Sequence, residues 1–252
     1  MKKSLIKLLS VSLAMTLLLT SSFPVFAQAN QTEEMRQEFA NASADEFDDL
    51  VLDYLHQNEE EKTFEQIQAE LSAAGVTLTK GTGIEPNGLP PRDIEIVTYT
   101  MKRTGDVRVW LTGEVEFKNS EPSPGGLDAL GISWEASKAS YDSYSVSDSD
   151  VLSAGDVSQR LNGMFLFNLD DYYVQPNRGY SVTVVVRAKS SASGQRLDYA
   201  TTLLHTYGSN TYNWSFGSAL TLVPVGGAFT FTVNSNYVKE TYTESDTGYI
   251  IL

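Results

Sequence analysis

Short runs in which apolar and polar residues alternate occupy much of the chain after residue 93, and this pattern constrains the fold more than any other feature. In residues 107–117 every second residue is apolar or glycine, and the residues between them are mostly charged or polar. Residues 180–188 and 130–136 repeat the alternation. Because successive side chains of a strand point to opposite faces, such runs are typical of strands with one face against a core.

These runs and their neighbours predict about eight strands, separated by Gly, Asn, Ser and Pro. Many short strands with turn residues between them indicate antiparallel sheets. We therefore predict a mainly β fold, an antiparallel β-sandwich of the immunoglobulin-like or jelly-roll-like kind. Residues 137–158, rich in Ser and Asp, are expected to form a surface excursion between strands. The predicted strands are 94–101, 107–117, 130–136, 164–169, 180–188, 197–204, 212–223 and 229–233.

A helical period precedes the strands. Ser43 with Glu46 and Thr63 with Gln66 match the capping-box pattern, and Gly75 is a candidate left-handed cap. The pattern predicts a short α-helical hairpin, and we expect residues 43–75 to pack on the β domain because the apolar stripe must be buried. The stripe consists of Phe47, Leu50, Val51, Tyr54, Leu55, Phe64, Ile67 and Leu71.

Charge and composition exclude several classes of function. The net charge is −14, and residues 33–70 alone hold 13 acidic and 2 basic residues. This balance disfavours nucleic acid and anionic membrane surfaces as partners. The chain has no cysteine, which excludes disulfides, thiolate metal sites and cysteine nucleophiles, and its 2 histidines make a multi-histidine metal centre unexpected.

The N-terminus has the pattern of a secretory signal peptide. Three lysines precede the apolar run Leu8–Leu19, and Val25-Phe26-Ala27 matches the small-x-small cleavage pattern. No second long apolar run follows, so we expect no membrane span after removal of the signal and a secreted or extracellular protein, in some settings cell-wall associated. The expected division is signal peptide 1–27, acidic helical hairpin 28–80, linker or loop 81–92 and β-sandwich 93–252.

No motif for catalysis is evident. The Gly-x-Ser-x-Gly elbow of serine hydrolases is absent, His205 lies at the end of a predicted strand, where a structural role is expected, and His56 ends an acidic helix. We therefore name no catalytic residue and no cofactor.

Carboxylates give two further candidate sites. The loop around Asp148 and Asp150 offers oxygen ligands but departs from the EF-hand pattern at its Gly and Glu positions, so we name no metal site. Glycoside hydrolysis needs two facing carboxylates, and the only candidates we name for it are Glu114, Glu116 and Glu135, which lie within predicted strands.

Aromatic residues are the remaining signal for binding. Trp110 lies on the polar side of its strand, whereas four tyrosines lie in or beside loops. Exposed rings stack on sugars or anchor protein partners. Alternatively, the helical hairpin covers Trp110. The candidate binding residues are Trp110, Tyr141, Tyr144, Tyr172 and Tyr173.

Five short stretches between residues 130 and 210 carry a resemblance. They are Trp134, Lys138–Tyr141, Arg160–Gly163, Leu166–Asn168 and His205–Tyr207. With them the chain resembles a group of exported β-rich proteins of Gram-positive bacteria. The resemblance implies export and a β fold, and it assigns no catalytic residues.

Three functional interpretations follow. The first is a secreted or cell-envelope, non-catalytic interaction module that binds carbohydrate or a protein partner, because no reactive constellation is evident. The second is a polysaccharide-acting hydrolase on a β-sandwich. The third is that the acidic hairpin acts as a pro-segment or inhibitor.

We predict that the signal peptide is removed after Ala27, because the residues before that position have the cleavage pattern. Mass spectrometry of the exported protein should find a chain that begins at Gln28. A full-length chain held in the membrane would contradict this prediction.

Overall fold

A computed structural model describes residues 32–81, 94–119, 127–207, 213–216, 231–234 and 240–252. The predicted signal peptide and almost all of the predicted linker lie outside these residues. No helix among the described residues is long and apolar enough to cross a membrane.

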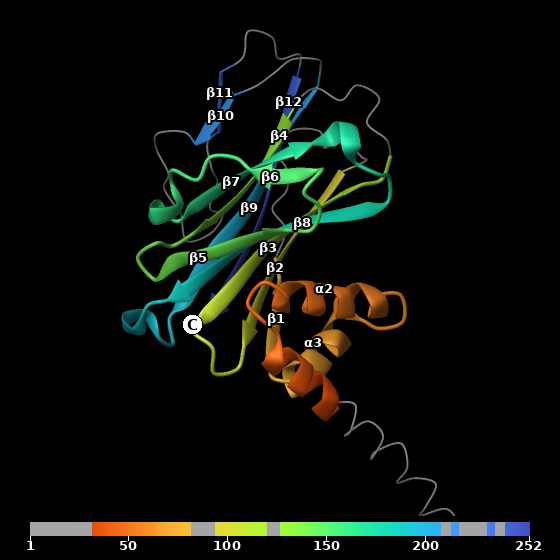
Figure 1. Cartoon of the computed structure of the whole chain (residues 1–252), viewed down its shortest axis with the longest axis vertical. Coiled ribbons are helices and arrows are strands. Elements are labelled where there is room, and N and C mark those ends of the chain that lie inside the picture. Colours follow the sequence, from red (N-terminus) through yellow and green to blue (C-terminus); the bar gives the residue numbers. More distant parts are fainter. Residues whose placement is uncertain (1–31, 82–93, 120–126, 208–212, 217–230, 235–239) are drawn as a thin grey trace, which may run out of the picture.

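Two five-stranded antiparallel sheets dominate the structure (Figure 1), which confirms the prediction of a mainly β, antiparallel sandwich. Two short strands, β10 and β11, form a separate two-stranded sheet. The first sheet has the order β1 (Val76–Lys80), β2 (Ile94–Arg103), β3 (Arg108–Phe117), β8 (Arg178–Ala188) and β5 (Ala139–Val146). The second has the order β12 (Glu240–Ile251), β9 (Arg196–Tyr207), β4 (Leu127–Trp134), β7 (Met164–Asp170) and β6 (Leu152–Ala154), while β10 spans Asn213–Phe216 and β11 Phe231–Asn234.

The main core lies between the two sheets. Alternate residues of β3 enter it, from Val109 to Phe117, and meet the inward rows of β4, β7 and β9. Gly113 interrupts the β3 row because a Cβ there would overlap the side chain of Thr201 on β9. The residues at every second position of β3, which the sequence pattern marked as apolar, are therefore the ones that face the second sheet.

A second core lies on the opposite face of the first sheet, under the helical hairpin. Helices α2 (Phe47–Asn58) and α3 (Phe64–Ala73) lie beside β1 and β2 (Figure 1), preceded by a helix over residues 32–41. This confirms that the hairpin packs on the β domain, and it gives the protein three layers. The fully buried contacts include Phe47, Val51, Ile67, Leu71, Leu78, Met101 and Trp110.

Two of the three predicted caps are present. Thr63 and Gln66 form a complete capping box at the start of α3, and Gly75 has φ +85° just after the helix ends. Ser43 does hydrogen-bond the Glu46 carboxylate, with its Oγ 2.8 Å from Oε2. Helix α2, however, begins only at Phe47, with Glu46 as its N-cap residue and no side-chain cap, so this pair closes the preceding turn instead.

Several segments differ from expectation. The expected excursion 137–158 contains strands β5 and β6. The sequence did not predict β5 because it is an edge strand rich in Ser and Asp, with Ser140, Asp142 and Tyr144 exposed. Residues 76–80, expected to end the hairpin segment, form β1 and pair with β2. Strand β12 was not predicted, and Glu135 lies in the turn after β4, not in a strand.

We predict that Leu71→Ala lowers the free energy of unfolding by roughly 2–5 kcal/mol, because it leaves a cavity in the second core. The matched control is Leu161→Ala, since Leu161 is 83% exposed. Urea unfolding with limited proteolysis measures both effects. An unchanged midpoint, or rapid cutting within α2 and α3 while the sheets stay protected, would contradict the shared core.

Candidate functional site

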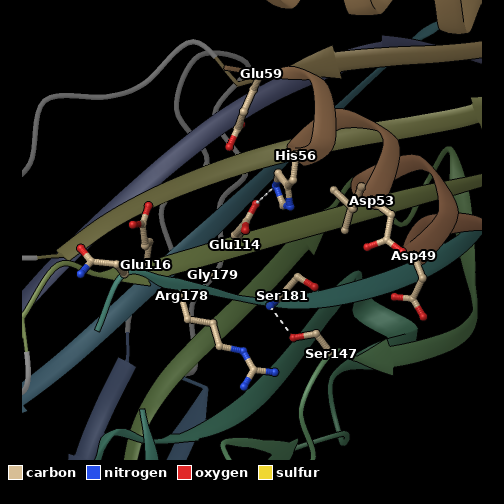
Figure 2. Close-up of a pocket in the computed structure, with 12 residues that line it drawn as sticks. Asp49, Asp53, His56, Glu59, Glu114, Glu116, Ser147, Arg178, Gly179 and Ser181 are labelled. Atoms are coloured by element: carbon tan, nitrogen blue, oxygen red, sulfur yellow. Dashed lines mark hydrogen bonds and ion pairs between the residues drawn. The ribbon is translucent and has the colours of Figure 1, made fainter. Parts of the chain in front are cut away.

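An open hollow of about 430 Å³ lies between helix α2 and the outer face of the first sheet (Figure 2). Helix α2 is amphipathic, so its apolar side anchors it to the sheet while its polar side lines the hollow. Carboxylates outnumber the cationic groups, which are Arg178 and, when protonated, His56. The lining residues are Asp49, Leu52, Asp53, His56, Glu59, Glu114, Glu116, Ser147, Asn177, Arg178, Gly179 and Ser181.

An ion pair bridges the helix and the sheet at the centre of the hollow. The His56 Nε2 lies 3.1 Å from Glu114 Oε2 (Figure 2), and the Glu114 side chain is only 13% exposed. The hydrogen bond to Glu114 raises the pKa of His56 above its ordinary value of 6.5. Gly179 on β8 leaves room for this carboxylate, because a Cβ there would overlap Glu114 Oε1.

Two further acids stand at the start of α2. Asp48 is buried against the sheet and accepts a hydrogen bond from Ser145 Oγ at 2.7 Å. Burial raises the pKa of Asp48, and burial followed by the charges of Asp48 and Asp53 raises the pKa of Asp49. Asp49 lines the hollow together with Asp53 and Glu59, so the helix side of the hollow is acidic.

The three carboxylates considered for glycoside hydrolysis are only partly brought together. Glu114 and Glu116 line the same hollow, whereas Glu135 lies outside it. Each is engaged with a basic side chain: Glu114 with His56, Glu116 with Lys118 at 2.5 Å, and Glu135 with Lys138 at 2.7 Å. Such engagement favours structural roles for these groups.

Trp110 is fully buried beneath the hairpin. Its ring centroid lies 4.4 Å from that of Phe47, and its Nε1 donates a hydrogen bond to the Ala44 carbonyl at 2.9 Å. Of the two interpretations of this out-of-phase tryptophan, the structure shows coverage by the hairpin. The ring offers no surface to a ligand in this arrangement.

The four candidate tyrosines lie in two places. Tyr141 and Tyr144 of β5 pack against Phe165 of β7, with centroids 5.7 Å and 4.8 Å away. They therefore cover the side of the main core, with Tyr141 half-buried and Tyr144 41% exposed. Tyr172 and Tyr173 instead project from a short 3-10 helix, Asp171–Tyr173, that follows β7.

This segment Asp171–Tyr173, which we call the tyrosine turn, combines exposed rings with a fixed backbone. Tyr172 is 70% and Tyr173 57% exposed, and their rings meet edge to face at 5.1 Å. The Asp170 carboxylate accepts a hydrogen bond from the Tyr172 backbone N–H at 3.2 Å, and the Asp171 side chain is buried. The turn thus presents two neighbouring aromatic faces to solvent.

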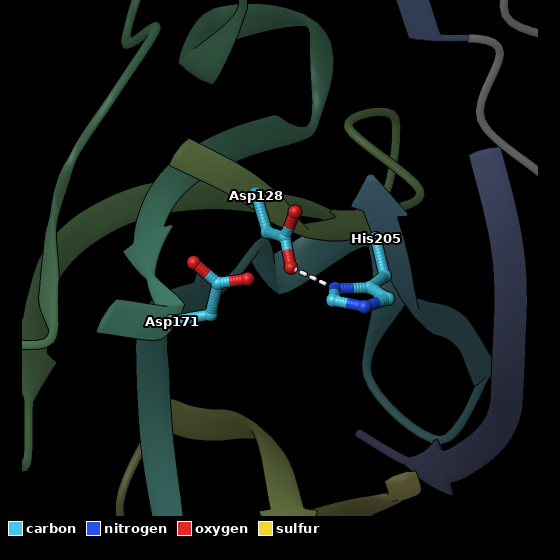
Figure 3. A group of neighbouring side chains, drawn as sticks. All are labelled: Asp128, Asp171 and His205. Atoms are coloured by element: carbon cyan, nitrogen blue, oxygen red, sulfur yellow. Dashed lines mark hydrogen bonds and ion pairs between the residues drawn. The ribbon is translucent and has the colours of Figure 1, made fainter. Parts of the chain in front are cut away.

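The core also holds a group of ionisable side chains that sequence reasoning missed. Asp128, Asp171 and His205 converge between the sheets (Figure 3), and the Asp128 carboxylate contacts His205 Nδ1. A signal existed: Asp128 continues the inward row of Leu130 on β4, and His205 continues that of Leu203 on β9. Polar residues in an otherwise apolar row mark buried polar groups.

Comparison with known proteins finds no matching family model and no matching curated sequence. Among solved structures, one concerned with pH-induced modulation of Streptococcus parasanguinis adhesion by Fap1 fimbriae has 11% identity and a TM-score of 0.37, over 68% of this chain and 94% of that one. The seventh ScaB type I cohesin of Pseudobacteroides cellulosolvens has 12% identity and a TM-score of 0.30, over 42% and 80%. The sixth cohesin of Acetivibrio cellulolyticus scaffoldin B, in complex with a Cel5 dockerin mutant, has 17% identity and a TM-score of 0.26, over 55% and 95%. Similarities this low assign no function to the chain.

We predict that His56→Gln destabilises the protein more in acid than in base. Because the folded pKa of His56 is raised, its pair with Glu114 contributes fully below about pH 6.5 and loses that contribution as pH rises through the folded pKa. Urea unfolding of both proteins at about pH 5.5 and about pH 9 measures the difference. Glu114→Gln should lose the same pH-dependent part, and an equal effect of His56→Gln at both pH values would contradict the ion pair.

Proposed function

We propose that this protein is a secreted or cell-envelope, non-catalytic interaction module whose contact surface is the tyrosine turn. The observation that carries the proposal is the pair of exposed rings of Tyr172 and Tyr173 on a short 3-10 helix whose Asp171 side chain is buried. Large aromatic side chains supply much contact area at a low entropy cost, which is why they serve as anchors in binding sites. The predicted signal peptide supports the extracellular location.

The proposed ligand is a polysaccharide or a protein of the cell envelope. Flat tyrosine rings fit either, by stacking on a sugar face or by filling a pocket of a partner. The acidic net charge of −14 adds a preference for partners that carry basic groups, since like charges would repel.

A polysaccharide hydrolase is the second candidate, because Glu114 and Glu116 line one hollow. We rank it lower, since both groups are held in ion pairs with His56 and Lys118. Release of soluble sugar from a polysaccharide panel, stopped by Glu114→Gln, would support the enzyme over the module.

The third candidate, a hairpin that acts as a pro-segment or inhibitor, has one favourable observation, which is that the hairpin covers Trp110. Displacing it would expose the whole second core, at roughly 1.5–3 kcal/mol for each large apolar side chain. This cost favours a permanent structural layer.

We predict that the double substitution Tyr172→Ala with Tyr173→Ala weakens binding to the ligand at least tenfold, because it removes both exposed rings. Pull-down with a panel of polysaccharides and with cell-envelope fractions identifies the ligand, and titration measures the loss. The matched control is Tyr249→Ala, a tyrosine of β12 that is 47% exposed. Equal binding by the double variant and wild type, or equal loss in the control, would contradict the assignment to this turn.

A further inference from the structure

The buried group in the main core brings together side chains from three separate elements. Asp128 comes from β4, His205 from the neighbouring strand β9, and Asp171 from the tyrosine turn after β7 (Figure 3). One ligand atom from each lies within 4.8 Å of the others, and none of the three residues is more than 3% exposed. We call these residues the Asp-His-Asp trio.

The surroundings of the trio make its charge expensive. The Phe117 ring stands edge-on to the His205 ring, with centroids 6.2 Å apart, and Leu169 and Leu203 are fully buried nearby in the same core. Isolated charges in such a place cost several kcal/mol each unless they are compensated. Within the trio, the Asp128 carboxylate contacts the His205 imidazole, and the Asp171 carboxylate lies close to both.

A divalent cation is a partner that all three side chains can share, because their ligand atoms converge on one place in the core. Two carboxylates and a neutral imidazole around a 2+ ion sum to zero charge, which suits a closed apolar core. The donor set is also a mixed one. The imidazole nitrogen favours Zn²⁺ and related transition ions, whereas Ca²⁺ and Mg²⁺ prefer sites made of oxygen alone.

We propose that Asp128, Asp171 and His205 bind a divalent transition-metal ion of the Zn²⁺ or Mn²⁺ class. Metal–ligand distances of about 2.0–2.2 Å place two ligand atoms at most about 4.4 Å apart, so small side-chain rotations bring the trio to that geometry. The ion takes the place of the proton held between Asp128 and His205, and binding therefore releases that proton to solvent.

The position of Asp171 gives the ion a structural consequence. Asp171 points into the core, and the next two residues are the exposed Tyr172 and Tyr173. A metal bond to Asp171 ties the tyrosine turn to β4 and β9. The metal site itself does not depend on the proposed binding function, because it rests on the trio alone.

The test uses the processed full chain, stripped with EDTA and then titrated separately with Zn²⁺ and Mn²⁺. We expect a saturable rise in Tm, roughly 5–10 °C when the free metal is about 100 times Kd, and one ion retained per chain after gel filtration. Asp171→Asn keeps the side-chain shape and removes a charged ligand, so it should lose both effects. Asp150→Asn makes the same change at an exposed aspartate and should keep both.

A measurement on the wild-type chain covers the case in which Asp171→Asn fails to fold. The chain has only 2 histidines, so NMR separates the imidazole signals of buried His205 and of His56 in the hollow. Metal should perturb His205 and leave His56 unchanged. Absence of bound metal with both ions, perturbation of His56 instead, or metal retained by a folded Asp171→Asn chain would overturn the site.

Discussion

The first sheet must be covered on both faces, and the rest of the structure depends on this. Its inner face joins the main core through residues such as Val109 and Val184, and its outer face carries Tyr99, Trp110 and Val185. A sheet with two apolar faces is unstable in water unless each face meets another layer. The second sheet covers one face, and the hairpin covers the other.

The position of helix α2 follows from that requirement and in turn creates the hollow. Once Phe47 and Val51 are buried against Trp110, the rotation of the helix is set, and the next turns bring His56 over Glu114. Asp48 reaches Ser145 for the same reason. The electrostatic features of this interface are therefore consequences of apolar packing.

The alternation of apolar and polar residues was enough to predict the strands that have one apolar row, and it missed strands that lack such a row. Strands β3 and β8 were predicted because alternate residues enter the main core. Strands β5 and β12 were not, since both lie at sheet edges and their residues are mostly Ser, Thr, Asp and Tyr. An edge strand buries less surface, so selection for an apolar row is weak there. Trp110 did signal the second layer, because a large apolar ring out of phase needs a cover.

The candidate sites also differ in how far the sequence alone could predict them. Exposure of Tyr172 and Tyr173 was predictable from their place beside a turn, which is a local property. The convergence of Asp128, Asp171 and His205 was not, because it requires knowing that β9, β4 and β7 are neighbours in the second sheet. Strand order depends on contacts between residues that are distant in the chain. The pattern of a single sequence does not show which strands are neighbours.

The hollow under α2 and the Asp-His-Asp trio also differ in how their surroundings treat charge. The hollow under α2 is open, so water and counterions screen its surplus carboxylates at little cost. The Asp-His-Asp trio is closed among Phe117 and the leucines of the second sheet, where solvent does not screen its charges. Because Asp171 also begins the tyrosine turn, we expect the proposed ion to hold the exposed rings more firmly.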